Sequence, residues 1–420
     1  MPTVLVIGYV WPEPNSSAAG QRMLQILEYF TINNYKVIFT TTAAPSEKMV
    51  DLEEIGISSE KIELNNSSFD DYISQLQPEI VLFDRFMMEE QFGWRVDKFS
   101  PDSIKILDTE DLHFLRNYRA DTKLDKASIK NSELTKREIA SIYRCDLTLI
   151  ISEEEQKLLT TDFNIPNNLL LYLPFLIDSK IEENLLPTFE ERQHFISIGN
   201  FKHKPNIDAV NYLKKEIWPI IRKELPEAEL HIYGAYPTQN VLQLHNPKEK
   251  FFVNGWAENA ENVVKNARVS LAALRFGAGL KGKLAEAMKC GTPNVTTLIG
   301  TEGMSGTLPW SSGYVAESAV EFAKAAVSLY KDKETWLVFQ QNGFVLIENR
   351  FNKANFHAIL KNRLIDLASN LQEHRNSNFI GTMLSHHSMK STQHLSKYIQ
   401  IKNELEQLKA DLSKQDFSPN

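Results

Sequence analysis

The densest group of residues suited to binding a ligand is the stretch from Arg275 to Gly291, RFGAGLKGKLAEAMKCG. Its glycines let backbone N–H groups approach an anion closely, and the helical pattern that follows adds the positive end of a helix dipole. Its basic side chains add formal charge, so the stretch predicts a diphosphate site. The alternative is a tight turn with solvated lysines. The residues expected to hold the diphosphate are Arg275, Gly277, Gly279, Leu280, Lys281 and Lys283.

The same turn reads G-x-G-x-x-G, and Glu302 lies 20 residues after Gly282, about the spacing of the ribose-binding acid in dinucleotide folds. A nicotinamide-dependent oxidoreductase is therefore one alternative. That fingerprint usually opens the first βαβ unit of its domain, whereas this turn comes late in the second half of the chain. Glu286, one helical turn after Lys283, is the better candidate for binding ribose hydroxyls.

A second group of charged residues, ILDTEDLHFLRNYR (106–119), follows a short apolar strand. It contains Glu110, Asp111 and His113. Charged side chains at the C-terminal end of a strand indicate the wall of a cleft. A lone histidine often has a purely structural role, so we give equal weight to a structural role of His113 and to a role in the site.

Both groups must be positioned by strands, and the chain alternates strands with helices as a doubly wound α/β fold requires. Apolar runs at 4–10, 36–42, 79–84, 105–108 and 147–152 alternate with amphipathic stretches, and the rhythm restarts with HFISIGN (194–200). Continuous apolar runs indicate strands covered on both faces, as in parallel sheets. Ligands of such sheets bind beyond the C-terminal ends of the strands.

The chain of 420 residues is long enough for two sizeable domains. We place the first at 1–185 and the second at 186–365, because the segment after Pro174 lacks clear periodicity and a new strand follows it. A helical tail with a polar linker (376–394) occupies 366–420. Apolar residues between 395 and 413 recur at steps of three and four, which predicts either a surface helix or weak coiled-coil self-association.

Composition argues against several classes of protein. The net charge of −8 argues against a nucleic-acid partner, and two distant cysteines indicate neither a disulfide framework nor a zinc site. No apolar run approaches the roughly 20 residues of a membrane span. The N-terminus lacks the basic region of a secretory signal, so a cytoplasmic protein is expected.

The order and spacing of several motifs resemble glycosyltransferase family 4, whose members are retaining enzymes with the GT-B fold of two facing Rossmann-like domains. The resemblance covers most of residues 1–365. It rests on GNFKHKPNIDAV (199–210), ELHIYGAYP (229–237) and the block from FVNGW (252–256) to KLAEAMKCGTPNVTTLIGTEGM (283–304). It implies a nucleotide-sugar donor and a hydroxyl acceptor, with no cofactor and no metal ion. It also suggests surface polysaccharide or glycoconjugate synthesis, with peripheral contact at the inner membrane face.

The resemblance also assigns residues of the donor site. Glu286 matches the second glutamate of the family's E-x7-E motif, which binds the nucleotide ribose. Lys283 and Arg275 fall where a subgroup of the family has phosphate-binding basic residues. The remaining donor-binding candidates are Gly20, Arg22, Asn200 and Lys204.

The acceptor side is less regular. Glu110 and Asp111 fall where many relatives have His-Asp, and with His113 they are expected to orient the acceptor hydroxyl or take its proton. Ala278 occupies the place of the family's first glutamate, which contacts the donor sugar. A non-catalytic protein that binds nucleotide sugars is therefore a second alternative.

Overall fold

The first domain is built on a parallel sheet of strand order β3-β2-β1-β4-β5-β6-β7. The computed structural model describes residues 1–121, 126–178 and 180–415. Every residue of β4, β5 and β6 is buried, because apolar clusters pack on both faces of the sheet. The strands are β1 (Thr3–Gly8), β2 (Lys36–Thr41), β3 (Ser58–Lys61), β4 (Ile80–Asp84), β5 (Ile104–Asp108), β6 (Leu147–Ile150) and β7 (Leu170–Tyr172).

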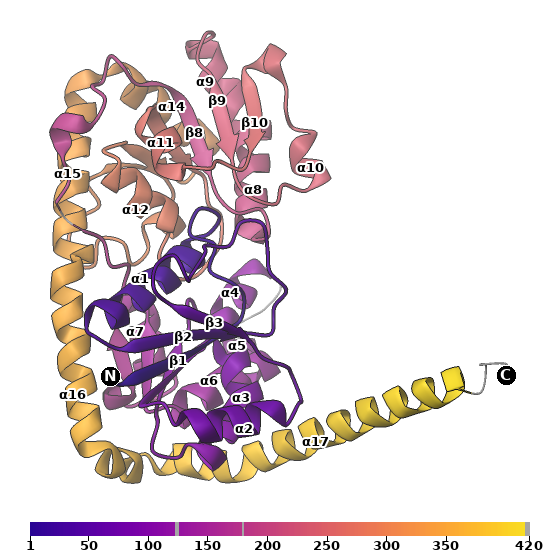
Figure 1. Ribbon diagram of the computed structural model, residues 1–420. Helices are drawn as coiled ribbons and strands as arrows, with labels where there is room; N and C mark the ends of the chain where they lie inside the picture. The colour runs from indigo at the N-terminus through magenta and orange to yellow at the C-terminus, as the bar shows by residue number, and fades with distance from the viewer. Residues whose placement is uncertain (122–125, 179, 416–420) are drawn as a thin grey trace.

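The second domain repeats this plan with a parallel sheet of order β10-β9-β8-β11-β12-β13. In both sheets the first three strands are added on one side of the sheet, and the next strand returns to lie beside the first. This switch creates a crevice between β1 and β4 and another between β8 and β11. The predicted arrangement of two doubly wound domains is confirmed (Figure 1). The strands are β8 (Gln193–Ile198), β9 (Leu230–Tyr233), β10 (Phe251–Gly255), β11 (Ala267–Ala272), β12 (Asn294–Thr296) and β13 (Gly313–Val315).

Helices connect the strands and cover both sheets. The first of them is capped by Ser17, whose hydroxyl accepts a hydrogen bond from the Gly20 N–H. In the first domain they are α1 (Ala18–Ile32), α2 (Ser68–Leu76), α3 (Phe86–Phe99), α4 (His113–Ala120), α5 (Lys126–Asn131), α6 (Glu133–Arg144) and α7 (Glu153–Asp162). In the second domain they are α8 (Lys204–Tyr212), α9 (Trp218–Glu224), α10 (Gln239–Leu242), α11 (Ala260–Lys265), α12 (Gly282–Lys289), α13 (Leu298–Thr301), α14 (Ala319–Lys331) and α15 (Lys333–Phe351), with a π-helical turn at 213–217 between α8 and α9.

The chain passes between the domains twice, and the two crossings are hydrogen bonded to each other. The N–H of Ile177 donates to the carbonyl of Phe351 (2.8 Å), and the N–H of Lys353 donates to the carbonyl of Ile177 (2.9 Å). From there α16 (Lys353–Ser377) runs down the first domain (Figure 1). Helix α16 packs on the first domain, so the chain returns to that domain at residue 353. The predicted end of the second domain is residue 365. The α16 side chains in the core of the first domain are Leu360, Leu364 and Leu367.

The segment at 376–394 forms the end of α16 and more than a third of α17 (Phe379–Gln415). The predicted polar linker is therefore wrong. This helix lies on α3 and α6 and is held partly by polar contacts, which leave little apolar periodicity in the sequence. Arg95 donates to the buried hydroxyl of Ser396 (3.2 Å), and Gln400 donates to the hydroxyl of Ser67 (3.1 Å).

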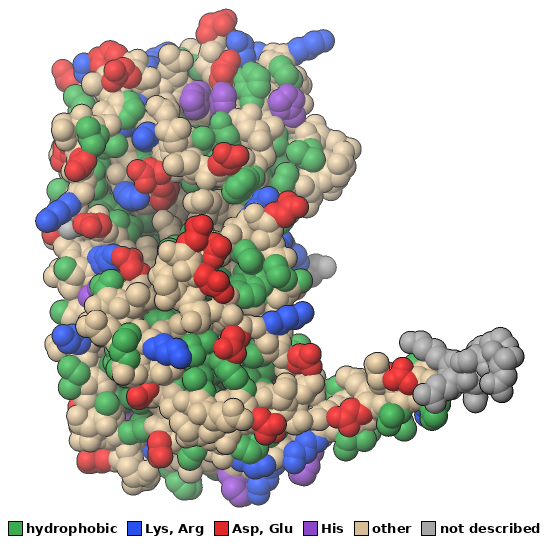
Figure 2. Space-filling view, in the orientation of Figure 1, with side chains coloured by type: hydrophobic (Ala, Val, Ile, Leu, Met, Phe, Trp, Pro, Cys, Tyr) green, Lys and Arg blue, Asp and Glu red, His purple; other side chains and the backbone are tan. Residues whose placement is uncertain are grey.

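Beyond Gln400, α17 leaves the body of the protein and projects away from the first domain (Figure 1). Every residue from Ile401 to Leu412 is exposed. An apolar stripe follows this part of the helix, and its side chains are between 50% and 66% exposed (Figure 2): Tyr398, Ile401, Leu405, Leu408 and Leu412. Self-association through 395–413 stays a prediction. No helix in the described ranges is both long and apolar enough to cross a membrane.

A buried ion pair ties the start of α1 to the centre of the first sheet. Arg22 is 1% exposed, and its guanidinium donates to both carboxylate oxygens of Asp108 at the end of β5 (2.9 to 3.3 Å). It also donates to the carbonyls of Leu173 (2.6 Å) and Pro174 (3.1 Å). One side chain therefore joins α1, β5 and the segment that leaves β7.

We predict that Arg22→Ala lowers the free energy of unfolding by about 3–5 kcal/mol, because it leaves the Asp108 carboxylate buried and unpaired. Arg275→Ala is the matched control. Arg275 pairs with Asp208 on the surface, with its side chain 50% exposed, so its loss should cost about 0–1 kcal/mol. Urea unfolding followed by tryptophan fluorescence measures both. Equal effects of the two substitutions would contradict the buried clamp.

Candidate active site

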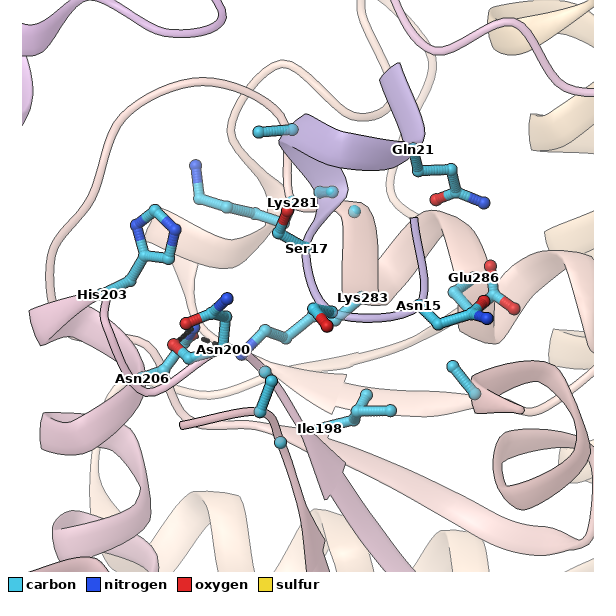
Figure 3. A pocket seen from close by; sticks show the side chains of 18 of the residues that line it. Asn15, Ser17, Gln21, Ile198, Asn200, His203, Asn206, Lys281, Lys283 and Glu286 are labelled. Carbon is cyan, nitrogen blue, oxygen red and sulfur yellow. Dashed lines mark hydrogen bonds between the residues drawn. The ribbon is translucent and has the colours of Figure 1, made fainter. Parts of the chain in front are cut away.

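A cavity of about 390 Å³ lies between the two domains, at the C-terminal ends of both sheets. The loops after β1 and β5 line it from the first domain, and those after β8, β9, β10 and β11 line it from the second. Figure 3 shows part of this lining. The cavity therefore opens at the crevice of the second sheet, where doubly wound folds bind ligands. The molecular surface is hollowed between the domains (Figure 2).

The turn after β11 and the N-terminus of α12 bring two ammonium groups to this cavity. The Nζ of Lys283 donates to Oδ1 of Asn206 (2.8 Å), and the Nζ of Lys281 donates to the carbonyl of Gly279 (2.5 Å). Burial, with the neighbouring Lys281 charge, lowers the pKa of Lys283 to about 8. Burial lowers the pKa of Lys281 as well. Two cations beside a helix N-terminus favour the binding of an anion.

Glu286 lies one turn further along α12 and lines the same cavity (Figure 3). It also borders an adjoining space of about 130 Å³, together with Gln21 of α1. Burial raises the pKa of its carboxyl group, which Gln21 and Cys290 partly oppose by hydrogen bonding. A carboxylate one helical turn beyond Lys283 can bind hydroxyl groups of a ligand whose anionic part lies beside the two lysines.

The turn touches the first domain where its residues have no side chain. A Cβ added to Gly279 would lie 2.9 Å from the Cβ of Asp111, and one added to Gly282 would lie 2.5 Å from the Cβ of Ala18. Gly279 also has a φ of +62°, which disfavours other residues. Its N–H donates to the buried carboxyl group of Glu155 (2.9 Å). The glycine at 279 thus serves close packing between the domains.

The strand-end group of the first domain lies on the opposite wall. Glu110 follows β5 with a φ of +64° and lines the cavity, as does Asp111. Burial and the neighbouring Asp111 raise the pKa of Glu110 to about 7, against the opposing charges of Arg85 and Arg116. Both carboxylate oxygens of Asp111 accept from Arg116 at 2.6 Å. Asp111 is therefore held as an ion pair, whereas Glu110 is suited to exchange a proton near neutral pH.

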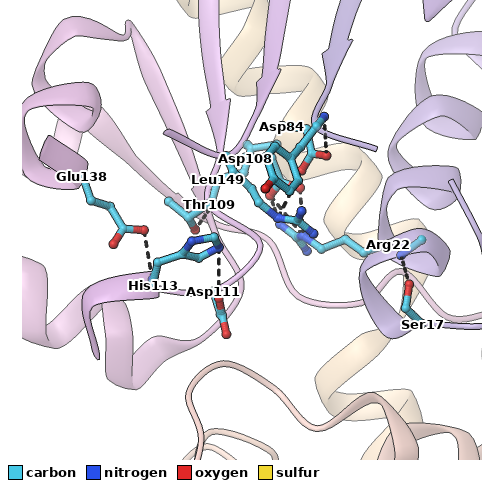
Figure 4. Close-up of polar contacts among 12 residues, drawn as sticks. Ser17, Arg22, Asp84, Asp108, Thr109, Asp111, His113, Glu138 and Leu149 are labelled. Atoms are coloured by element: carbon cyan, nitrogen blue, oxygen red, sulfur yellow. Dashed lines mark hydrogen bonds and ion pairs between the residues drawn. The ribbon is translucent and has the colours of Figure 1, made fainter. Parts of the chain in front are cut away.

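His113 is neutral over the physiological range. Burial lowers its pKa to about 3, and its Nε2 is buried without a hydrogen-bond partner, 3.7 Å from Asp111 (Figure 4). The backbone N–H of His113 donates to the carboxyl group of Glu138 (3.1 Å). Glu110, Asp111 and His113 carry donor atoms within 4.8 Å of one another, as a metal site requires. Arg116 occupies both oxygens of Asp111, so the geometry favours an ion pair over a divalent cation there.

A second cavity of about 510 Å³ adjoins the first on the side of the first domain. It reaches the crevice between β1 and β4 and shares Glu110, Arg116 and His203 with the first cavity. Glu110 is thus one of the residues at which the two cavities meet. A ligand in each would place reacting groups on either side of this residue.

The structure separates the residues predicted from the sequence into three sets. Those that line the first cavity are Glu110, Asp111, Asn200, Gly277, Leu280, Lys281, Lys283 and Glu286. Those that line only the second are Gly20, His113 and Lys204. Those that line neither are Arg22, Gly279 and Arg275.

The third set requires correction. Arg22 is buried, each of its three guanidinium nitrogens donates to Asp108 or to a backbone carbonyl, and it lines neither cavity (Figure 4). Arg275 turns to the surface, where it pairs with Asp208 and lies 4.8 Å from the ring of Tyr212. Gly279 is covered by Asp111.

Several residues at the site were not predicted from the sequence. Trp256 and His203 line the first cavity, and Arg85 lines the second. Arg85 could have been found by the strand-end rule that indicated Glu110, because it directly follows β4. His203 and Trp256 lie in motifs that carry the family resemblance, and no chemical pattern singled them out.

Glu302, the acid expected for a dinucleotide site, is not free to bind ribose. Arg119 of the first domain donates to both its carboxylate oxygens (2.6 and 3.0 Å) and to the carbonyl of Gly277 (2.9 Å). The glycine turn follows β11, the fourth strand of its domain in chain order, rather than the first. Both observations argue against the oxidoreductase alternative.

Comparison with known proteins agrees with this geometry. Residues 192–332 match the family model described as Glycosyl transferases group 1. No curated protein sequence matches the chain.

Solved structures resemble both domains together. Sucrose-phosphate synthase from Thermosynechococcus elongatus has a TM-score of 0.68 at 14% identity, covering 88% of this chain and 100% of that one. Anabaena HepE, solved with UDP-glucose, has a TM-score of 0.65 at 12% identity, covering 87% and 100%. WaaG, a glycosyltransferase involved in lipopolysaccharide biosynthesis, has a TM-score of 0.61 at 10% identity, covering 85% and 98%. Residues 192–332 thus match the glycosyl transferases group 1 model, and the two domains together have the GT-B fold of these solved structures.

Proposed function

We propose that the enzyme transfers a sugar from a nucleoside diphosphate sugar to a hydroxyl group of an acceptor. The observation that carries the proposal is the pair of ammonium groups, Lys281 and Lys283, beside the N-terminus of α12. Departure of the nucleoside diphosphate leaves negative charge on its phosphates. Positive groups already in place stabilise that charge without reorganisation during the reaction.

Glu286 is proposed to bind the ribose hydroxyls of the donor. Its carboxylate lies one helical turn beyond Lys283 and faces the same cavity, with Gln21 across from it. The loop after β10, with Trp256, then lies at the base end of the donor. The similarity to a protein solved with UDP-glucose makes UDP the first nucleotide to test, with GDP beside it.

Glu110 is proposed to take the proton of the acceptor hydroxyl. It borders both cavities, and its raised pKa lets it bind and release a proton near neutral pH. Of the other two candidates, Asp111 is tied to Arg116, and His113 has a pKa too low to bind a proton at neutral pH. We assign to Asp111 the positioning of Arg116, and to His113 the shaping of the second cavity.

Retention of anomeric configuration and independence from metal ions are part of the proposal. The two lysines and the helix N-terminus supply positive charge where a divalent ion would otherwise be needed. The resemblance to family 4 supports retention. Similarity to a protein involved in lipopolysaccharide biosynthesis supports a role in surface polysaccharide or glycoconjugate synthesis.

A non-catalytic sugar-nucleotide binding protein is the second candidate, because Ala278 lines the donor cavity where the family has a carboxylate. The two candidates differ in turnover. A screen of UDP- and GDP-sugars that detects nucleotide binding but no release of UDP or GDP, with or without acceptors, would favour the binding protein.

We predict that Lys283→Ala weakens UDP or GDP binding about ten- to hundredfold, because it removes a charged hydrogen-bond donor to the phosphates. Isothermal titration calorimetry measures the change. Lys331→Ala, which removes an exposed lysine at the end of α14, is the control and should bind as the unmodified chain does. Unchanged binding by Lys283→Ala would refute the phosphate role.

We predict that the transfer rate rises with pH through about 7, because Glu110 must be deprotonated to accept a proton. Glu110→Gln should remove this rise and lower the rate by about 10²- to 10⁴-fold. A pH profile of kcat/KM checks both statements. Glu133→Gln, on the surface of α6, should keep the full profile. If the rise survives in Glu110→Gln, another group is the base.

We predict that excess EDTA leaves the transfer rate unchanged, since the lysines of the donor site supply the positive charge. The comparison is made on protein purified without added metal, with and without Mg²⁺ or Mn²⁺. A rate that falls in EDTA and returns with either ion would point to the Glu110, Asp111 and His113 group instead.

A further inference from the structure

Arg85 has a largely buried guanidinium whose Nε–H has no hydrogen-bond acceptor among the residues that the structure describes. Its side chain is 11% exposed and lines the second cavity. Its Nε is buried without a hydrogen-bond partner, and its closest carboxylate oxygen, on Asp84, is 3.7 Å away. The ring of Tyr9 lies 5.1 Å from the guanidinium carbon. Burying such a group costs free energy unless a ligand supplies the missing acceptor.

The backbone holds Arg85 at the position where a ligand of this sheet is expected. It follows β4 in the crevice between β1 and β4, and its N–H donates to the carbonyl of Asp108 (2.8 Å). Its φ of +71° and ψ of 158° are rare for a residue with a side chain. Glu110, after the neighbouring strand β5, also has a positive φ. Conformations of this kind persist chiefly at functional sites.

The unfilled hydrogen-bonding capacity of the second cavity consists mainly of donors. Lys202 and Lys204 stand at its rim, and neither pairs with a carboxylate in the part of the chain that the structure describes. Lys202 lies 3.6 Å from the ring centre of Tyr236. With Arg85, they present three cations to one space, and Arg116 is already paired with Asp111.

The acidic groups of this cavity, in contrast, are largely satisfied. Glu13 accepts from the hydroxyls of Ser46 (2.6 Å) and Tyr236 (2.7 Å). Asp84 accepts from the N–H of Tyr9 (3.0 Å). The raised pKa of Glu110 leaves it partly neutral near pH 7. The lining groups that still lack a hydrogen-bond partner within the described chain are therefore mainly donors.

We propose that Arg85, with Lys202 and Lys204, binds an oxyanion carried by the acceptor, so that the acceptor bears a phosphate or a carboxylate besides the hydroxyl that receives the sugar. A planar guanidinium can donate two parallel hydrogen bonds to either group. The inference rests on the proposed function, because it assigns the second cavity to the acceptor. Glu110 then lies between this anchored end and the donor cavity.

The test compares three small hydroxyl compounds with one carbon skeleton: glycerol, glycerol 3-phosphate and glycerate. Each is titrated against the full chain carrying Lys283→Ala, which weakens anion binding in the first cavity, and the midpoint of thermal unfolding is followed. We expect at least one of the two anions to raise the midpoint at concentrations where glycerol has no effect. Whichever anion binds more tightly identifies phosphate or carboxylate as the preferred group.

Adding Arg85→Gln should weaken binding of the anion at least tenfold. The anion affinity of Arg85→Lys should lie between those of the chain with Arg85 and of Arg85→Gln. Lysine keeps the positive charge but lacks the planar guanidinium that donates two parallel hydrogen bonds. Lys204→Gln changes an exposed rim residue that cannot disturb the fold, and it should weaken binding severalfold. Equal binding of glycerol and both anions, or unchanged anion binding in Arg85→Gln and Lys204→Gln, overturns the inference.

Nucleotide binding separates this inference from the proposed function. UDP and GDP are titrated in parallel against the unmodified chain and Arg85→Gln, and equal affinities are expected because Arg85 does not line the donor cavity. If the unmodified chain binds neither nucleotide, the proposed function fails whatever the anions do. If it binds nucleotide and no variant alters anion binding, only the role of Arg85 fails.

Discussion

The arrangement of the two domains depends on how closely the glycine turn of the second domain approaches the first. Gly279 lies against Asp111, and Gly282 lies against Ala18, at distances that no side chain would permit. Because these contacts bring α12 up to the first domain, Lys281 and Lys283 face Glu110 across a narrow space. Larger residues at the two positions would separate the cations from the acid, even if each domain still folded.

Electrostatics then divides the space between the domains into two compartments. Lys281 and Lys283 are cations of the first cavity, and Arg85 and the rim lysines are cations of the second. Glu110 stands between them, with a pKa that partial burial raises and the nearby arginines restrain. Burial raises the pKa values of two other carboxyl groups, Glu138 and Glu155, to about 8. Each accepts a hydrogen bond from a backbone N–H, and these bonds hold the loops around the site.

Strands buried on both faces could be predicted from the sequence, because their apolar runs are uninterrupted. Edge strands could not: β3 is SSEK, largely exposed, and has no apolar signal. At the site, residue type and spacing identified Lys283 and Glu286. The same reasoning could not separate these from Arg22, whose role is decided by Asp108, a partner 86 positions away in the chain. The role of an arginine such as Arg22 is thus decided by contacts that form only when the chain folds.

The return of the chain to the first domain has a mechanical consequence. The two connectors are hydrogen bonded to each other between Ile177 and the residues on either side of Asn352. Any opening of the cleft therefore turns about one paired segment instead of two independent tethers. The N-terminus and the long C-terminal helix both belong to the body on one side of that pivot. A probe attached to either end would therefore travel with the first domain, and only a probe within residues 193–351 would report the movement of the second domain.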